Sequence, residues 1–202
     1  MKNTLGYTFP VNFRDVHYLA ALYISNAEAV GKQLIGTGLK AGLILKGKPV
    51  VALGLIQYKN SDLGSYNEVI IAIPVIPEQE KSGYANWLEL YAPLKTRKLG
   101  QYIIHIPVDS VQSMEAGRNL WGYPKTVLPI NHQFAQHNVE SSIMGEDGNK
   151  KLVAFYGNLG IGIPIPSMNL MTYSFLNDWR LHLCNCAMTR GSRQSYSPLT
   201  NS

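Results

Sequence analysis

Lys125 is the residue whose surroundings point most directly to chemistry. It follows Gly122, Tyr123 and Pro124. The glycine predicts the end of a helix, and the proline prevents its resumption and keeps the preceding residue extended. A lysine at such a corner is either a solvated loop residue or an amine held in a dry pocket. Burial disfavours an ammonium and frees a nucleophilic amine, which forms imines with carbonyl compounds. On the residues alone the solvated alternative is favoured, because most lysines are exposed.

The segment before this corner is predicted to be a helix that begins after Asp109 and ends at Gly122. Asp109 and Gln112 have the spacing of a capping box. The apolar residues that can share one helix face are Val111, Met114 and Leu120. Beyond the corner, residues 127–130 are apolar and predict a strand that leads away from Lys125.

The rest of the sequence predicts many strands separated by short turns. The expected strands are residues 16–24, 39–45, 50–58, 69–76, 102–106, 139–144, 151–156, 170–176 and 179–186. Two short helices are also expected, one after a capping box of Ser25 and Glu28 and one after Ser82. This pattern predicts an α+β fold, mainly antiparallel β, whose sheet is curled or closed into a barrel, with a few short peripheral helices.

Length and composition are those of a globular protein with one main domain. The 202 residues are 46% hydrophobic and 15% charged, which suits a sizeable core. We expect a single domain over residues 1–189 and a polar, mobile tail over residues 190–202. The sequence shows neither an apolar signal core nor a run long enough to span a membrane. We therefore expect a cytoplasmic protein without a membrane partner.

Charge and cysteine usage argue against several classes of partner. The net charge of +5 comes from scattered lysines and arginines, so we expect no nucleic-acid partner. His182, Cys184 and Cys186 alternate along one predicted strand face, but no fourth ligand accompanies them and their spacing is poor for a metal. Buried thiols are the better interpretation. No phosphate-binding glycine motif is present, and we predict neither a metal nor a cofactor.

Two segments of the sequence resemble the acetoacetate decarboxylase family. Residues 117–125, Gly-Arg-Asn-Leu-Trp-Gly-Tyr-Pro-Lys, are similar to the segment around the Schiff-base lysine of that family. Residues 66–75, which contain Tyr-Asn-Glu and then Ala-Ile-Pro-Val, are similar to its Tyr-x-Glu element before an Ile-Pro-Val strand. The resemblance extends over about residues 10–185. It implies a cone-like β-barrel with peripheral helices, cofactor-free chemistry and association into a homo-oligomer.

The same resemblance implies roles for individual residues. Lys125 would form the imine with a small oxo-acid, and its cationic nitrogen would then act as an electron sink. Glu68 matches the family glutamate and would position the amine or transfer a proton, although a solvated carboxylate at a strand start is the alternative. Tyr123 matches the aromatic position two residues before the lysine and would form a wall of the pocket.

Three further residues receive weaker assignments from the resemblance. Arg118 belongs to the Gly-Arg pair and would supply positive charge or bind a carboxylate, but an arginine near a helix C-terminus is also simply favourable. Trp121 belongs either to the pocket or to the core. Arg14 matches the arginine proposed to bind the substrate carboxylate only if the alignment contains a small gap.

Two departures from the family pattern bear on the reaction. Family decarboxylases carry two successive lysines after the proline, and the second position is Thr126 here. A second family glutamate would fall near Leu53 and is absent. Decarboxylation of a small oxo-acid is the first hypothesis, and aldolase or dehydratase chemistry through the same imine is the alternative. The rival from another class is a non-catalytic small-molecule-binding protein of the same fold.

Overall fold

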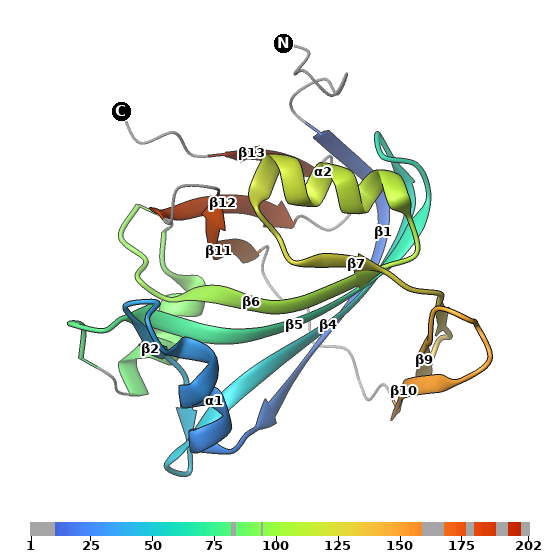
Figure 1. Cartoon of the computed structure of the whole chain (residues 1–202). Helices are drawn as coiled ribbons and strands as arrows, with labels where there is room; N and C mark the ends of the chain where they lie inside the picture. Colours follow the sequence, from blue (N-terminus) through green and yellow to red (C-terminus); the bar gives the residue numbers. More distant parts are fainter. Residues whose placement is uncertain are drawn as a thin grey trace.

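The computed structural model describes residues 11–81, 84–93, 95–158, 168–176, 180–188 and 194–198. Four long strands form the wall that carries the candidate site (Figure 1): β1 (Val11–Ile24), β4 (Lys48–Ser61), β5 (Tyr66–Pro77) and β6 (Gly100–Val108). Antiparallel pairing joins β1 to β4, β4 to β5 and β5 to β6. All four strands extend beyond the ranges expected from the sequence, and the prediction of a mainly antiparallel structure is confirmed.

The strand predicted over residues 39–45 is divided into two short strands. β3 (Ile44–Leu45) pairs with the start of β4, whereas β2 (Leu39–Ala41) pairs with the end of β5. Lys46 and Gly47 connect β3 to β4 with φ values of 50° and 74°. Positive φ at both positions suits the tight turns that match the twist of a hairpin.

The C-terminal strands lie between β6 and β1 in the main sheet. They are β11 (Met168–Leu176), β12 (Arg180–Met188) and β13 (Gln194–Pro198). β11 pairs in parallel with β6, β12 pairs with both β11 and β13, and β13 pairs with the start of β1. Residues 194–198, within the stretch predicted to be a mobile tail, therefore form a strand that pairs with a neighbour on each side, because polar side chains do not prevent backbone pairing.

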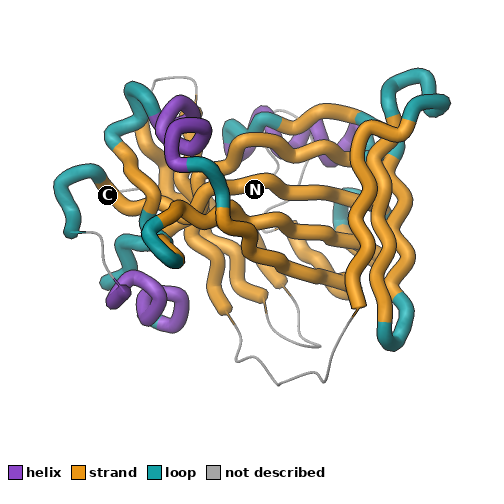
Figure 2. The backbone as a smooth tube through the Cα atoms, turned by 90° about the horizontal axis from the view of Figure 1, so that it is seen from below, coloured by secondary structure: helices purple, strands orange, loops and turns teal. Residues whose placement is uncertain are grey.

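The main sheet is mixed and strongly curved rather than a regular closed barrel (Figures 1 and 2). β7 (Lys125–Val127) and β11 are both parallel to β6. Among the described residues, β11 meets β6 through two residue pairs and β13 meets β1 through three, whereas eleven pairs join β1 to β4. The curled sheet was therefore the better of the two alternatives, and the cone-like barrel is not confirmed, because short contacts rather than long ladders join the C-terminal strands to both sides.

A separate three-stranded antiparallel sheet projects from one end of the molecule (Figure 2). Its strands are β8 (Ile130–Phe134), β9 (Asn138–Met144) and β10 (Lys151–Asn158). The strands predicted over residues 139–144 and 151–156 are confirmed, and β9 and β10 pair as an antiparallel hairpin. β8 joins this sheet to the segment that follows Lys125.

Three helical segments flank the strands: α1 (Ala27–Leu34), the 3-10 helix η1 (Tyr84–Tyr91) and α2 (Val111–Trp121). The N-cap of α1 is Asn26, whose side chain accepts hydrogen bonds from two backbone amides, so the predicted Ser25 cap was one residue early. Val30 and Leu34 form the buried face of α1. Ser82 lies outside the described residues. In the described part of the chain, no helix is long and apolar enough to cross a membrane.

Helix α2 differs from the prediction at its start and on its buried face. Ser110 is the N-cap and accepts a hydrogen bond from the Ser113 amide, whereas Asp109 accepts two hydrogen bonds from Asn67. The buried residues of α2 are Ser113, Ala116, Gly117 and Trp121. Val111 is 56% exposed. Of the predicted apolar face, Met114 and Leu120 are partly buried against the hydrophobic cluster and only Val111 was wrong. The most buried face of α2 consists mainly of small residues, which allow a close approach.

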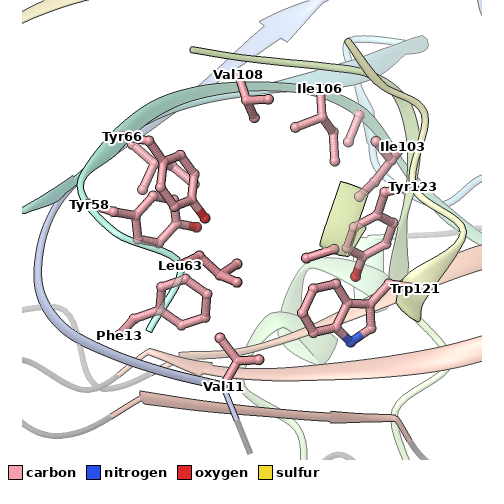
Figure 3. Close-up of a cluster of buried hydrophobic side chains, with 13 residues drawn as sticks. Val11, Phe13, Tyr58, Leu63, Tyr66, Ile103, Ile106, Val108, Trp121 and Tyr123 are labelled. Carbon is pink, nitrogen blue, oxygen red and sulfur yellow. The ribbon is translucent and has the colours of Figure 1, made fainter. Parts of the chain in front are cut away.

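The largest hydrophobic cluster lies between the long strands and α2. Figure 3 shows its labelled side chains pointing toward one another from β1, β4, β5, β6 and the end of α2. The cluster comprises Val11, Phe13, Ile56, Tyr58, Leu63, Tyr66, Ala72, Ile103, Ile106, Val108, Ala116, Trp121 and Tyr123. Its tyrosines bring hydroxyl groups into an otherwise apolar interior, next to which Lys125 is buried.

The cap of α2 is open to a direct test. We expect Ser110→Ala to lower the free energy of unfolding by about 1 kcal/mol, because the Ser113 amide loses its acceptor. For a chain of this size the melting temperature should fall by about 2–4 °C. Ser110→Asp, which keeps a capping oxygen, should recover most of this loss. Equal stability of Ser110→Ala and the wild type in thermal unfolding would show that the cap contributes nothing.

Candidate active site

The corner after α2 turns Lys125 into the interior. Gly122 ends the helix with a φ of 65°, and its amide donates to the carbonyl of Arg118. Tyr123 donates to the carbonyl of Gly117, and the amide of Lys125 donates to the carbonyl of Tyr123 over 2.8 Å. These bonds hold the chain in a tight bend, after which Lys125 begins β7. Its side chain is only 6% exposed, so the solvated alternative does not hold.

Glu68 lies directly against the buried amine. Its Oε2 is 2.6 Å from Lys125 Nζ, and Glu68 is 4% exposed. Strand β6 brings the two residues together although they are 57 positions apart. Its residues pair with Glu68 on one side and with Lys125 on the other. Two charges so far from water require each other, because a single buried charge costs several kcal/mol.

Three hydroxyl-bearing side chains surround this pair. Ser113 Oγ is 3.0 Å from Lys125 Nζ, and Ser113 is fully buried. Lys125 Nζ lies 5.7 Å from the centroid of the Tyr66 ring, within the range of a cation–π contact. The Tyr58 hydroxyl donates to Glu68 Oε1 over 3.5 Å. No role was predicted for these hydroxyl groups. In the sequence, Tyr66 lies in the Tyr-x-Glu motif, and Ser113 is a polar residue four positions before Gly117 on the helix.

Gly117 allows α2 to lie on the stem of Lys125. A Cβ atom at this position would lie 2.6 Å from Lys125 Cε and closer still to Cδ. Real Cβ atoms essentially never approach a neighbour this closely. Any larger residue at position 117 must therefore displace the lysine stem or the helix.

A buried histidine supports Glu68 from the small sheet. His132 Nε2 lies 3.1 Å from the carbonyl oxygen of Glu68, and Nδ1 lies 2.9 Å from Ser141 Oγ. Because a carbonyl only accepts, Nε2 carries the proton and Nδ1 accepts from Ser141. Burial lowers the pKa of His132, which favours this neutral form. The sequence analysis did not identify His132, since one histidine in an alternating strand carries no distinctive pattern.

Three of the other predicted residues, Arg118, Tyr123 and Trp121, lie at the corner that precedes or contains Lys125. Arg118 Nε donates to the backbone carbonyl of Lys125 over 2.7 Å. Tyr123 is buried, and its hydroxyl shares a 2.8 Å hydrogen bond with Thr172. Trp121 stacks on Tyr123 with 6.3 Å between ring centroids. These contacts hold the corner in place, and the Trp121 contact favours core packing over a role in binding.

Arg14 is not brought to the lysine. It forms an exposed ion pair with Asp62 and a hydrogen bond with Asn60. Thr126, at the position of the second family lysine, is exposed, because neighbouring residues of a strand point to opposite faces. Leu53, near which the second glutamate would fall, is buried in an apolar cluster.

A cavity of about 200 Å³ opens beside the corner. It is lined by Gln33, Tyr102, Ile103, Ile104, Gly122, Tyr123, Pro124 and Tyr173. Neither Lys125 nor Glu68 is among its lining residues. Ile103 and Tyr123 belong both to this lining and to the large hydrophobic cluster, so the cavity adjoins that cluster.

No group of three potential metal ligands is found among the residues described in the structure. His182, Cys184 and Cys186 lie on β12, but their side chains are outside the described part. The prediction of buried thiols at these positions therefore stays a prediction.

The chain belongs to the acetoacetate decarboxylase family. The family model for acetoacetate decarboxylase matches residues 2–132, a range that includes Glu68 and Lys125. No curated protein matches the sequence. The resemblance found in the two short motifs is therefore confirmed by a match over more than half of the chain.

Solved structures of low sequence identity share the fold. An acetoacetate decarboxylase superposes with a TM-score of 0.64 at 15% identity, covering 97% of this chain and 78% of that one. The acetoacetate decarboxylase of Legionella pneumophila gives 0.62 at 13% identity, covering 96% and 75%. The enduracididine biosynthesis enzyme MppR, complexed with pyruvate, gives 0.59 at 13% identity, covering 91% and 74%. Both kinds of enzyme thus have the architecture described above.

The buried His132 predicts a pH dependence of stability. Its pKa is lowered in the folded protein, whereas an unfolded chain binds a proton near pH 6.5. The unfolded state therefore binds more protons below about pH 6.5, and stability falls as the pH falls. In urea unfolding between about pH 7.5 and 5.5, His132→Gln should reduce this slope by at most about 1.4 kcal/mol per pH unit. His137→Gln, which changes an exposed histidine, should keep the wild-type slope, and equal slopes for all three proteins would contradict this assignment.

Proposed function

We propose that this chain is a Schiff-base-forming lyase that acts on a small oxo-acid through Lys125. The observation that carries the proposal is the buried contact of 2.6 Å between Lys125 Nζ and Glu68 Oε2. A carboxylate at this distance is placed to accept a proton from the ammonium and to return it later. Membership of the acetoacetate decarboxylase family supports the same chemistry.

The proposed reaction begins when Glu68 accepts a proton from Lys125. The neutral amine attacks the carbonyl carbon of the substrate, and loss of water leaves a protonated imine. In a 3-oxo acid, the bond to the carboxylate then breaks, carbon dioxide leaves, and its electron pair moves toward the imine nitrogen to form an enamine. Protonation of the enamine carbon and addition of water release the ketone and restore the amine.

Decarboxylation is the outcome that we place first, because the family model is that of a decarboxylase. Aldol or dehydration chemistry through the same imine is the alternative. It is supported by the similarity of fold to MppR, one structure of which contains the condensation product of pyruvate and imidazole 4-carboxaldehyde. The engagement of Arg14 with Asp62 and of Arg118 with a backbone carbonyl favours the alternative, since a decarboxylase has to hold the substrate carboxylate.

Trapping of the imine tests the proposal. Incubation with acetoacetate or pyruvate and sodium borohydride should add the mass of the reduced adduct to one peptide, the one containing Lys125. Lys125→Arg should abolish the adduct, because a guanidinium does not form an imine under these conditions. Lys59→Arg, which changes an exposed lysine, should leave the adduct intact. The products formed without borohydride then distinguish decarboxylation from aldol chemistry.

The rival hypothesis predicts a different result in the same experiment. A non-catalytic binding protein should show a higher melting temperature with an oxo-acid or related carbonyl ligand but no reducible adduct. Absence of an adduct at both neutral and mildly alkaline pH, with thermal stabilisation retained, would place the binding protein first. An adduct at lysines other than Lys125 would contradict the assignment of the site.

Gly117 provides a second, independent test of the site geometry. In Gly117→Ala, the new methyl group should displace the stem of Lys125, which lies within 2.6 Å of its position. A misplacement of about 1 Å can slow a reaction by about 100-fold, and we expect adduct formation to slow by that order.

Gly31→Ala in α1 is the matched control, because nothing lies within 4 Å of its Cβ position. It should raise stability by up to about 1 kcal/mol through helix propensity and leave adduct formation unchanged. An unaltered rate in Gly117→Ala would show that the lysine stem has more room than the contact distances allow.

A further inference from the structure

We propose that Ser113 holds one N–H bond of Lys125 throughout the proposed reaction and thereby directs the lone pair of the amine toward the substrate. The observation that carries this inference is the buried contact of 3.0 Å between Lys125 Nζ and Ser113 Oγ. The inference rests on the proposed function, because it concerns how the imine-forming amine attacks a carbonyl carbon. It assigns a role to a residue that lies outside both family motifs.

Helix α2 follows the Lys125 side chain from its stem to its tip. Gly117 lies against the stem, since a Cβ atom at this position would come within 2.6 Å of Lys125 Cε. Ser113 lies four residues earlier, on the same face of the helix, and contacts the terminal nitrogen. Figure 1 shows α2 beside β7, the strand that Lys125 begins. The spacing of Gly117 and Ser113 therefore places a hydroxyl group at the end of the lysine side chain.

The hydroxyl group of Ser113 is not required for close packing. The buried face of α2 also contains Ala116 and Gly117, and an alanine at position 113 would be small enough for the same approach. Ser113 is fully buried, and a buried hydroxyl group requires a hydrogen-bond partner. Lys125 Nζ is such a partner. A serine at this position therefore indicates a role for its oxygen atom.

Lys125 Nζ has two hydrogen-bond acceptors in the described part of the chain. Glu68 Oε2 lies 2.6 Å from it, and Ser113 Oγ lies 3.0 Å from it. An ammonium group only donates, so both contacts use N–H bonds of Lys125. A tetrahedral nitrogen bonded to Cε has three further positions, and the two acceptors face two of them. The third position is left for the substrate.

Proton transfer to Glu68 leaves the lone pair of Lys125 in an unproductive position. The lone pair at first faces the new carboxyl group, from which it accepts a hydrogen bond, and it cannot attack a carbonyl carbon there. A rotation of about 120° about the Cε–Nζ bond, from one staggered position to the next, turns the lone pair to the third position. The two remaining N–H bonds then point toward Glu68 and Ser113.

The hydroxyl group of Ser113 restricts this rotation. Its oxygen accepts an N–H bond both before and after the rotation, so the lone pair faces either Glu68 or the substrate. Without this oxygen, an N–H bond at the same position would have no partner in a buried site, which is unfavourable. The amine would then turn its lone pair to that position. Loss of the oxygen therefore adds an unproductive state that competes with the attacking one.

The same contact persists when the imine has formed. Two protons leave the nitrogen of the Lys125 ammonium group by way of Glu68, and both end in the water molecule that the carbonyl oxygen becomes. Glu68 is a carboxylate again after this step, and the cationic imine nitrogen keeps one N–H bond. That bond is directed at Ser113 Oγ, because the bonds facing Glu68 are the ones that break. Ser113 then fixes the plane of the C=N bond.

Two substitutions of Ser113 separate its oxygen atom from its size. Ser113→Cys keeps nearly the same shape but replaces the oxygen by sulfur, a weak acceptor. Ser113→Thr keeps the hydroxyl group and adds a methyl group. In a time course of trapping with oxo-acid and borohydride, we expect Ser113→Cys to be slower than the wild type on the order of tenfold, the effect of one lost hydrogen bond. Ser113→Thr should recover most of the rate, and the final amount of adduct should be the same in all three proteins.

Two controls separate orientation of the amine from other effects. Ser61→Ala removes a serine hydroxyl group that donates to the carbonyl of Gly64 in the turn before β5, and it should leave the trapping rate unchanged. The deficit of Ser113→Cys should be the same at neutral and mildly alkaline pH, because Ser113 orients the nitrogen and does not take up its proton. A wild-type rate in Ser113→Cys, equal rates in folded Ser113→Cys and Ser113→Thr, or a deficit that disappears at alkaline pH would overturn the proposal.

Failure of the proposed function can be distinguished from failure of this inference. If the wild type forms no oxo-acid adduct, the proposed function is wrong. Reductive methylation by formaldehyde and cyanoborohydride still reports the reactivity of the Lys125 nitrogen, because this reaction also begins with attack of an amine on a carbonyl carbon. Methylation of Lys125 should be slower in Ser113→Cys than in the wild type and Ser113→Thr. Equal methylation in the three proteins would overturn the role of Ser113 whatever the substrate of the protein is.

Discussion

The contact between Lys125 and Glu68 is the constraint on which the rest of the site depends. Neither charge reaches water, and each is tolerable in the interior only while the other is present. The fold meets this requirement through β6, which is antiparallel to the strand of Glu68 and parallel to the strand of Lys125. A shift of one residue in either register would turn one of the two side chains to the opposite face. The pairing of β7 with β6 is therefore needed to bring the charge of Lys125 next to the charge of Glu68.

The elements around this pair fix its position from three sides. Helix α2 approaches closely because its inner face is made of small residues, and Gly117 accommodates the lysine stem. Asp109, at the end of the loop from β6, binds Asn67, the neighbour of Glu68. His132 holds the carbonyl of Glu68 from the small sheet. Contacts to the backbone of Glu68 and to the neighbouring Asn67 therefore help to orient the carboxylate, in addition to its contact with the amine. A site of fixed geometry requires such supporting contacts.

Local sequence patterns predicted those features that depend on neighbouring residues. The helix end at Gly122 and the corner at Pro124 were predicted correctly, because glycine and proline act over a few positions. The two family motifs located Glu68 and Lys125.

The features that were not predicted from the sequence depend on residues that are distant in the chain. Asp109 was expected to cap α2, but Asn67, 42 residues away, engages it and Ser110 takes its place. No local pattern indicates that a serine in a helix will face a buried lysine, and the parallel pairing of β6 with β7 and β11 carries no local signal either.

The close contact between Gly117 and the lysine stem also has an entropic consequence. A lysine side chain in solution carries about 2 kcal/mol of rotamer freedom. Here the stem lies against a helix backbone, and its end is held by Glu68 and Ser113. Folding has therefore already restricted the Lys125 side chain to a narrow set of rotamers before any ligand enters. An incoming molecule would meet a side chain whose rotamers are already restricted. This restriction depends on the absence of a side chain at Gly117, eight positions earlier in the chain, which leaves the space that the lysine stem occupies.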